Sequence, residues 1–256
     1  MKAALRRLPA ALAVLGFWTA LWILLARFVG QELLLPSPLA VLRTLASMAG
    51  TSAFWLAALR SILRVLAGLL AATVLGVLLA ALTEKSALAR LLLSPAMTLV
   101  KSTPVASFII LALLWLGRDV LPAFITALMV LPVVWSNVSA GLAGRDRQLL
   151  ELAAVYRLPR LRVLRHITIP SVLPHFRAAL RSSLGMGWKA GIAAEVLTVP
   201  PLSIGKNIFE AKLYLETTQL FAWTLTVIVL SLLIERVLLR LVGRIGQKGG
   251  GACADA

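Results

Sequence analysis

Long uncharged apolar segments constrain this chain more than any other feature. One runs from Val65 to Thr83 and another from Val120 to Gly144, and a helix needs about 20 apolar residues to cross the hydrocarbon layer. Of the 256 residues, 60% are apolar, and the mean hydropathy is +0.94, well above soluble domains. Because backbone groups in lipid must be satisfied within each segment, the sequence predicts an all-α integral membrane protein.

Six membrane spans are predicted from these segments. The third is interrupted by Lys101 and by Ser102-Thr103-Pro104, where the proline should open the helix. The first apolar run is too long for a signal peptide and lacks a cleavage site, so it is expected to be retained. The spans cover residues 9–29, 55–83, 90–117, 119–143, 178–199 and 217–242. They make one membrane domain over residues 1–246, followed by a low-complexity tail, 247–256, that is expected to be disordered.

The basic residues of this chain, whose net charge is +16, bracket the apolar segments and do not form one continuous face. This distribution argues against nucleic-acid binding and follows the positive-inside rule. With six crossings, the basic groups before residue 9, at 85–90, at 145–177 and after 235 all lie on one side. That side is predicted to be cytoplasmic, with both termini there.

Residue types that carry catalysis are sparse. The single cysteine, Cys253, lies in the tail, and His166 and His175 have no ligand cluster around them, so we predict no metal site. No Gly-x4-Gly-Lys-Ser/Thr phosphate loop is present, and no nucleophile–base pair lies within the spans. We therefore predict a non-enzymatic protein that has no cofactor and does not use ATP by itself.

A basic segment between the fourth and fifth spans, residues 145–175, is here named the basic loop. Apolar residues recur in it at helical spacing, then a break follows, and then a second apolar set. The two sets are Leu149, Leu150, Ala153 and Ala154, and Leu161, Leu164 and Ile167. Two short helices meeting at an angle would form a knob able to fill a groove on a soluble partner. The alternative is a basic interfacial loop without a partner.

The basic loop resembles the EAA loop of permease subunits in ATP-binding-cassette importers, whose pattern is E-A-A-x3-G-x9-I-x-L-P. Four positions are in register, and they are Glu151, Ala153, Ile167 and Pro170. Leu152 and Ile169 are mild variants, and Arg157 stands where the pattern has glycine. The Leu-Pro-Ser-Pro sequence at 35–38 also resembles the nitrate/sulfonate/taurine branch of these permeases.

This resemblance implies the fold, location and partners of the chain. The fold would be that of a type I importer permease in the bacterial cytoplasmic (inner) membrane, surrounded by lipid. Its partners would be a cytoplasmic ATPase dimer, a second permease subunit, expected to be an identical copy, and an extracytoplasmic solute-binding protein. The solute would be small and anionic or zwitterionic, such as a sulfonate, taurine or nitrate.

The resemblance also assigns ATPase coupling to the basic loop. The residues concerned are Glu151, Ala153, Ala154, Arg157, Leu158, Pro159, Ile167 and Pro170. Arg157 does not adopt a left-handed conformation as cheaply as glycine, whereas Pro159 disfavours helix at Leu158. The break is therefore expected to shift by about one residue. Glu151 either orients the loop or touches the ATPase, or it forms a salt bridge to Arg147 or Arg145 worth under about 1 kcal/mol.

A translocation pathway is predicted from polar residues within the spans, because intramembrane charges tend to face a cavity or a partner. These residues are Lys101, Ser102, Thr103, Lys189 and Glu195. The alternative is that one lysine extends to the interface while the other pairs with Glu195.

Two further features of the second span are informative. Gly68, Ala72, Gly76 and Ala80 form a stripe of small residues, predicted to contact another helix of this chain or of a second copy. Arg60 and Arg64 near its outer end are expected to extend to the interface, the alternative being that they guide anions. Residues 35–48 are predicted to form a turn and a short helix at that outer interface.

Two other function classes remain as alternatives. An ion-coupled secondary transporter or a channel would need a larger set of carboxylates within the spans, and many such transporters contain inverted repeats; the sequence shows no internal duplication. A membrane-bound enzyme would need catalytic groups of the kinds found to be missing above.

Overall fold

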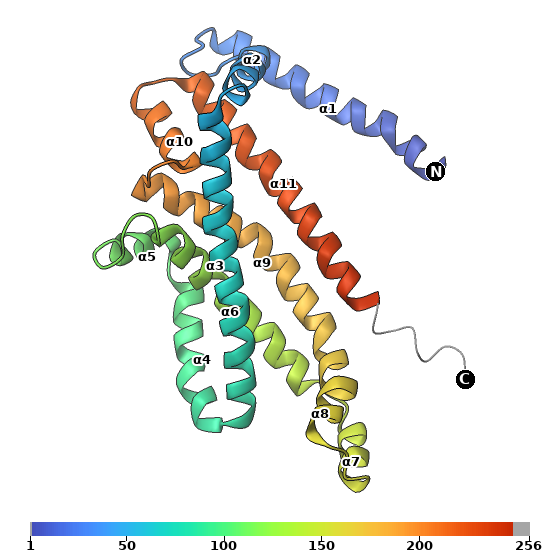
Figure 1. Cartoon of the computed structure of the whole chain (residues 1–256). Helices are drawn as coiled ribbons and strands as arrows, with labels where there is room; N and C mark the ends of the chain where they lie inside the picture. Colours follow the sequence, from blue (N-terminus) through green and yellow to red (C-terminus); the bar gives the residue numbers. More distant parts are fainter. Residues whose placement is uncertain (1, 248–256) are drawn as a thin grey trace.

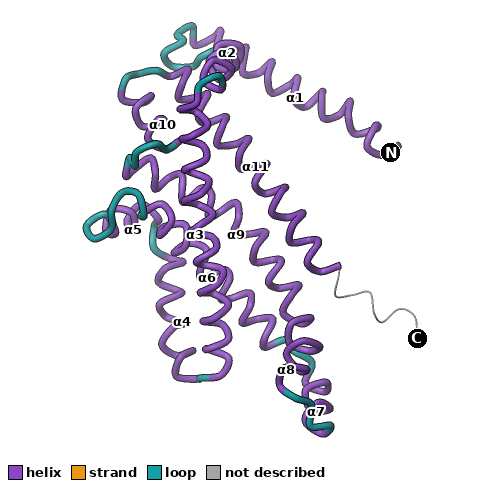
Figure 2. The backbone as a smooth tube through the Cα atoms, viewed as in Figure 1, coloured by secondary structure: helices purple, strands orange, loops and turns teal. Residues whose placement is uncertain are grey.

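The computed structural model describes residues 2–247 as a bundle of helices of unequal length (Figure 1). Throughout that part of the chain the regular secondary structure is helical, and loops occupy only the connections (Figure 2), which confirms the predicted all-α class. The helices are α1 (Lys2–Val29), α2 (Pro38–Ala49), α3 (Ser52–Lys85), α4 (Ala87–Ser102), α5 (Val105–Ala112), α6 (Leu121–Ala143), α7 (Arg147–Val155), α8 (Arg160–Val163), the π-helix η1 (Leu164–Thr168), α9 (Ile169–Thr198), α10 (Ile204–Leu213) and α11 (Thr217–Gln247).

The bundle has two distinct ends. One end carries α2 and α10, and is here named the α10 end; the opposite end carries the α3–α4 turn with α7 and α8, and is named the loop end (Figure 1). Helix α1 diverges from the rest of the bundle and approaches it only near the α10 end (Figure 1). There the indole nitrogen of Trp22 donates to the carbonyl of Pro36 at 3.1 Å.

Small residues bring α3 directly against α6. A Cβ added to Gly68 would lie 2.2 Å from the carbonyl oxygen of Ala123, and one added to Gly76 would lie 2.8 Å from Val134 Cγ1. Ala72 and Ala80 of the same stripe are fully buried. The predicted stripe therefore makes a contact within the chain, and the alternative of a contact with a second copy is not needed to explain it.

Glycines of α9 allow that helix to pack closely against α3 and α6. A Cβ added to Gly191 would lie 2.6 Å from both Thr126 Oγ1 of α6 and Val65 Cγ2 of α3. The hydroxyl of Thr126 also donates to the carbonyl of Gly187 at 3.3 Å. Close packing of this kind drives helix association where lipid supplies no hydrophobic gain. Helices α3, α6 and α9 therefore form the centre of the bundle.

Aromatic side chains join α11 to this centre. The rings of Phe54 in α3 and Trp223 in α11 stack with centroids 5.0 Å apart. The indole nitrogen of Trp188 in α9 donates to the carbonyl of Val227 at 3.2 Å. All three rings are buried, so α11 is fixed mainly near the α10 end.

Three helices of the described chain are long and apolar enough to cross a membrane, and they are Ser52–Lys85, Leu121–Ala143 and Thr217–Leu238. They correspond to the predicted spans 55–83, 119–143 and 217–242. Within the predicted span 9–29, the described segment Ala13–Val29 of α1 is a shorter apolar helix, and the predicted span 178–199 overlaps α9, which does not meet the same composition limit. Helix α9 carries charged residues along its length, including Arg177, Arg181 and Lys189. Six crossings therefore remain a prediction.

The predicted third span, 90–117, is a bent pair of helices. Helix α4 ends at Ser102, Thr103 is extended, and α5 begins at Val105 after Pro104. The two axes meet at 105°, so with α5 this segment is a broken span or a re-entrant turn. The break lies where the proline predicted it.

Two smaller predictions concern the segments outside the bundle centre. The short helix after Leu-Pro-Ser-Pro is α2; the hydroxyl of Ser37 accepts a hydrogen bond from the amide of Ala40 at 3.3 Å, and Pro38 occupies the first turn. Helix α11 extends to Gln247, the first residue of the predicted tail; residues 248–256 and Cys253 lie outside the described residues.

Candidate functional site

The basic loop folds into the two short helices that the sequence predicts, α7 and α8, with η1 leading into α9. Asp146 caps α7, and its carboxylate accepts hydrogen bonds from the amides of Gln148 and Leu149 at 2.8 and 3.4 Å. The loop lies beyond the end of α6, where a Cβ on Gly141 would approach Val172 Cα to 3.0 Å. The start of α9 is therefore held closely against the end of α6.

The break between α7 and α8 corrects one sequence prediction. Arg157 adopts a left-handed conformation, with φ +50°, at the position where the family pattern has glycine, so the break is not shifted. The amide of Leu158 donates to the carbonyl of Ala153 at 2.9 Å, and the amide of Arg157 to that of Ala154 at 3.1 Å. This is the Schellman pair of hydrogen bonds, which offsets the roughly 1–2 kcal/mol cost of that conformation for arginine. Pro159 then starts α8.

Three large apolar side chains are exposed on the basic loop and are here named the apolar patch: Val155, Tyr156 and Leu161. Ala153 points inward and is buried, whereas Val155, Tyr156 and Leu161 are 71–78% exposed. Ala154 and Pro170 are also exposed, and Ile167 is half-buried. Large apolar side chains that gather at the surface commonly mark an interaction site, and these three lie within seven residues of one another in the sequence.

Glu151 lies on the same exposed helix and pairs locally. Its carboxylate accepts a hydrogen bond from Arg147 Nε at 3.1 Å, one turn away. The Arg147 side chain is 90% exposed and that of Glu151 66%, so this pair contributes little to stability. The intramolecular salt bridge to Arg147 is thus formed, and contact with an ATPase stays a prediction.

The predicted pathway residues are not joined to one another by the hydrogen bonds and ion pairs of the described chain. Ser102 and Thr103 both donate to the carbonyl of Leu99, at 3.1 and 2.8 Å, and so close the end of α4. Lys101 and Lys189 are exposed. Glu195, in contrast, is completely buried.

Glu195, in α9, is enclosed by three donors from two other helices, α3 and α10. Its Oε2 accepts from the hydroxyl of Ser61 at 2.6 Å and from the amide of Gly205 at 3.2 Å. Its Oε1 accepts from Arg64 Nη1 at 3.3 Å. Because the second amide of α10 points at the carboxylate, the helix dipole adds to its stabilisation. Glu195 therefore pairs with Arg64 and not with a lysine, and it links α3, α9 and α10.

Arg64 extends this network to two loops, contrary to the prediction that it reaches the interface. Its Nη2 donates to Asp119 Oδ1 at 2.6 Å and to the carbonyl of Pro201 at 3.0 Å. The Arg64 side chain is 11% exposed, whereas that of Asp119 is 62% exposed. One guanidinium thus holds together α3, the α5–α6 connection and the α9–α10 connection.

The α9–α10 connection is itself unusual. Val199 and Leu202 have φ of +49° and +50°, and a β-branched residue rarely adopts such a conformation. The hydroxyl of Ser203 caps α10 by accepting from the amide of Lys206 at 3.0 Å. Gly205 is required here, since a Cβ would lie 2.3 Å from Glu195 Cβ. This strained turn aims the start of α10 at the buried carboxylate.

Sequence reasoning missed Ser61, Asp119 and Gly205 and misassigned Arg64. Ser61 and Arg64 are three residues apart and share a helix face, which was a local signal. Their partner Glu195 is more than 130 residues away along the chain, and no local pattern identifies such a partner. Within the described residues no group of three or more His, Cys, Asp or Glu side chains could hold a metal ion.

Comparison with known proteins agrees with the resemblance of the basic loop. The family described as "Binding-protein-dependent transport system inner membrane component" matches residues 72–247. The taurine transport system permease of Escherichia coli is 26% identical over 223 residues, 85% of this chain and 81% of that protein. A putative aliphatic sulfonates transport permease of Bacillus subtilis is 28% identical over 163 residues, 63% of this chain.

A third relative is the nitrate import permease of Leptolyngbya laminosa, 29% identical over 161 residues, 62% of this chain. The matched segments span 59% of the Bacillus protein and 56% of the Leptolyngbya protein. The family match itself covers more than half of this chain and includes α6, the basic loop and α9. The chain therefore belongs to the binding-protein-dependent transport system inner membrane components, as a permease of an ATP-binding-cassette importer of the nitrate, sulfonate and taurine type.

Proposed function

We propose that this chain forms the translocation pathway of an ATP-driven importer and couples to a separate ATPase through the basic loop. The observation that carries the proposal is the knob of α7 and α8, which presents an apolar patch beyond the end of the bundle. A rigid knob of this shape fits a groove on a soluble protein. Membership of an importer family supports an ATPase as the class of partner, and we propose that it acts as a dimer.

The orientation is part of the same proposal. The chain crosses the bacterial inner membrane six times, with the loop end and both termini in the cytoplasm. The basic residues gathered in the basic loop support this orientation through the positive-inside rule. A second copy of the permease and an extracytoplasmic solute-binding protein at the α10 end complete the assembly.

The cargo is a small anion or zwitterion, such as a sulfonate, taurine or nitrate. The functions named for the relatives support this class. Lys101, Ser102, Thr103 and Lys189 remain candidates for the pathway, because their side chains are not engaged in long-range ion pairs in the described chain. Glu195 is reassigned to a structural role, because its carboxylate is fully enclosed.

Co-purification from a mild detergent extract tests the coupling. The wild-type permease should retain an ATPase. It is compared with three variants: Tyr156→Asp, Glu151→Ala and a deletion of residues 151–165. Tyr214 provides a matched control, since it is exposed to 69%, against 71% for Tyr156, and lies at the opposite end. We expect Tyr156→Asp and the deletion to lose the ATPase and Tyr214→Asp to keep it. A well-folded wild type without any ATPase would overturn the proposal.

Labelling of single cysteines tests the orientation. In a Cys253→Ser background, cysteines at positions 155 and 214 are exposed in turn to an impermeant maleimide, using right-side-out vesicles. We expect reaction at position 214 without detergent and at position 155 only after the membrane is opened. The reverse pattern would place the loop end outside.

A further inference from the structure

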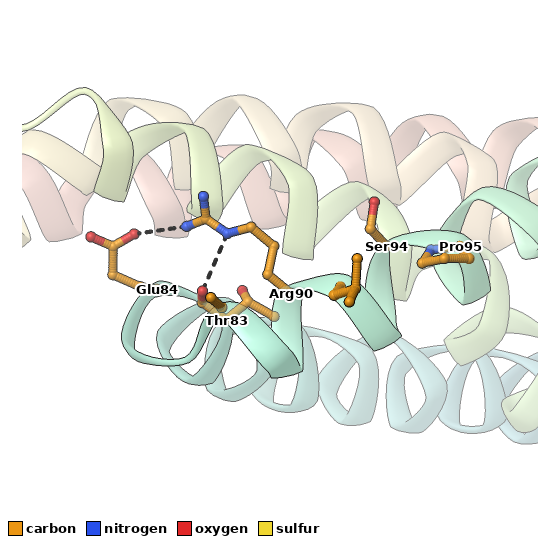
Figure 3. A pocket seen from close by; sticks show the side chains of 7 residues that line it. Thr83, Glu84, Arg90, Ser94 and Pro95 are labelled. Atoms are coloured by element: carbon orange, nitrogen blue, oxygen red, sulfur yellow. Dashed lines mark hydrogen bonds and ion pairs between the residues drawn. The ribbon is translucent and has the colours of Figure 1, made fainter.

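Glu84 connects three elements at the loop end. It lies in the last turn of α3, and its carboxylate accepts hydrogen bonds from Arg145 at Oε1 and from Arg90 Nη2 at Oε2, the latter at 3.3 Å. Figure 3 shows the guanidinium of Arg90 between this carboxylate and Thr83. The side chains of Glu84 and Arg145 are 27% and 21% exposed, so water screens this pair less than it screens the pair of Arg147 and Glu151.

Arg145 stands at the root of the basic loop, between the end of α6 at Ala143 and the start of α7. Its Nε donates to the carbonyl of Leu142 at 2.7 Å. One arginine therefore closes the end of α6 and binds α3 through Glu84. The next residue, Asp146, caps α7, so the anchored arginine lies directly before the N-cap of α7.

Arg90 extends the connection to α4. Its Nε donates to the carbonyl of Thr83 at 3.3 Å, and the indole nitrogen of Trp135 in α6 donates to the hydroxyl of Thr83 at 3.2 Å. An open groove of about 540 Å³ runs beside these contacts, between Glu84 and Pro95. The Arg90 side chain is 57% exposed. The ion pair between Arg90 and Glu84 is therefore weaker than the ion pair between Arg145 and Glu84.

We propose that Glu84 is a positioning residue for coupling: it fixes the root of the basic loop to the α3–α4 hairpin, so that both move as one rigid body. The proposal rests on the function proposed above. The other root of the loop is already fixed by the contact of Gly141 with Val172 and His175. With Glu84 in place, a displacement of α7 is transmitted to α3 and α4 as well as to α9. Rigid-body movement of this kind is a common form of conformational switching.

A spin-label distance measurement tests this inference. In a Cys253→Ser background, labels replace Leu88 on α4 and Gln148 on α7, both of which are exposed. The purified permease–ATPase complex is measured without nucleotide and with ATP and vanadate. We expect one narrow distance distribution that is the same in both states. We expect Glu84→Gln to lose that single peak, and the double exchange Glu84→Arg with Arg145→Glu to restore it.

Lys85→Gln is the matched control, since it removes a neighbouring exposed charge that has no ion pair in the described chain. It should leave the distribution unchanged. The inference is overturned if Glu84→Gln behaves like the control, or if the unmodified pair already changes its distance between the two states. If no ATPase co-purifies, the proposed function fails by itself, while the measurement without nucleotide still decides whether Glu84 holds the loop.

Discussion

The two ends of the bundle are held by different kinds of interaction. At the α10 end, buried Glu195 and the nearly buried Arg64 bind partners more than 130 residues apart in the chain and link α3, α9 and α10 with two connections. At the loop end, Arg147 and Glu151 pair across one exposed helical turn, whereas the contacts of Glu84 with Arg145 and of Thr83 with Trp135 reach further. The α10 end is thus a fixed frame of buried contacts, whereas α7 itself is held lightly beyond its anchored root.

The largest effect is expected from a substitution that disrupts the buried network of Arg64 and Glu195. Arg64→Gln leaves Glu195 without its only cationic partner among the described residues, and breaking a buried ion pair costs about 3–5 kcal/mol. The thermal unfolding temperature in detergent should fall sharply, or the protein should fail to accumulate. Arg60→Gln, one turn away and exposed, is the control. Equal unfolding temperatures for the two variants would show that the network does not hold this end.

Overpacking of the same frame should have a somewhat smaller effect. Gly205→Ala introduces a methyl group 2.3 Å from Glu195 Cβ and 2.4 Å from its carbonyl carbon, and overpacking typically costs about 1–3 kcal/mol. The open space around Gly117 makes Gly117→Ala the matched substitution. Thermal unfolding should separate the two variants, and a neutral Gly205→Ala would mean that α10 can move away from Glu195.

The ends of α7 and α10 share one motif, which allows a sharper comparison. Leu215 has φ +58°, and the amide of Glu216 donates to the carbonyl of Ala211 at 2.8 Å, the same arrangement as at Arg157. Arg157→Gly and Leu215→Gly should each raise the free energy of unfolding by about 1 kcal/mol or less. Glycine removes the cost of the left-handed conformation but increases the conformational entropy of the unfolded chain. Hydrogen exchange of the capped amides measures both gains. A gain at one end only would mean that the caps themselves differ.

The smallest effect is expected within the basic loop. Arg147→Ala removes an exposed pair and should change the stability by less than about 0.5 kcal/mol. The unfolding temperature should stay at the wild-type value. A clear loss of stability would contradict the view that the exposed contacts of α7 add little to stability.

Local sequence patterns predicted much of this fold. The apolar segments predicted α3, α6 and α11, Pro104 predicted the break before α5, and the small-residue stripe predicted a close helix contact. These features depend on residues near one another in the chain, so the sequence displays them directly. The two short helices of the basic loop were predictable for the same reason.

Long-range partners could not be predicted in this way. Arg64 looked like an interfacial side chain because nothing nearby in sequence pairs with it, and its partners Asp119 and Glu195 come from other elements. Arg157 was expected to avoid the left-handed region because its own preference opposes it. The carbonyls at the end of α7 supplied hydrogen bonds that outweigh this preference.

The bend between α4 and α5 has a consequence for hydration. A 16-residue helix such as α4 is about 24 Å long, shorter than the roughly 30 Å hydrocarbon layer. Pro104 has no amide hydrogen to donate to the carbonyl of Val100, four residues earlier. Irregular backbone is tolerated at membrane depth only inside protein or beside water. In a spanning arrangement, the bend at Thr103 must therefore face either protein or water, and a lipid-facing bend is excluded.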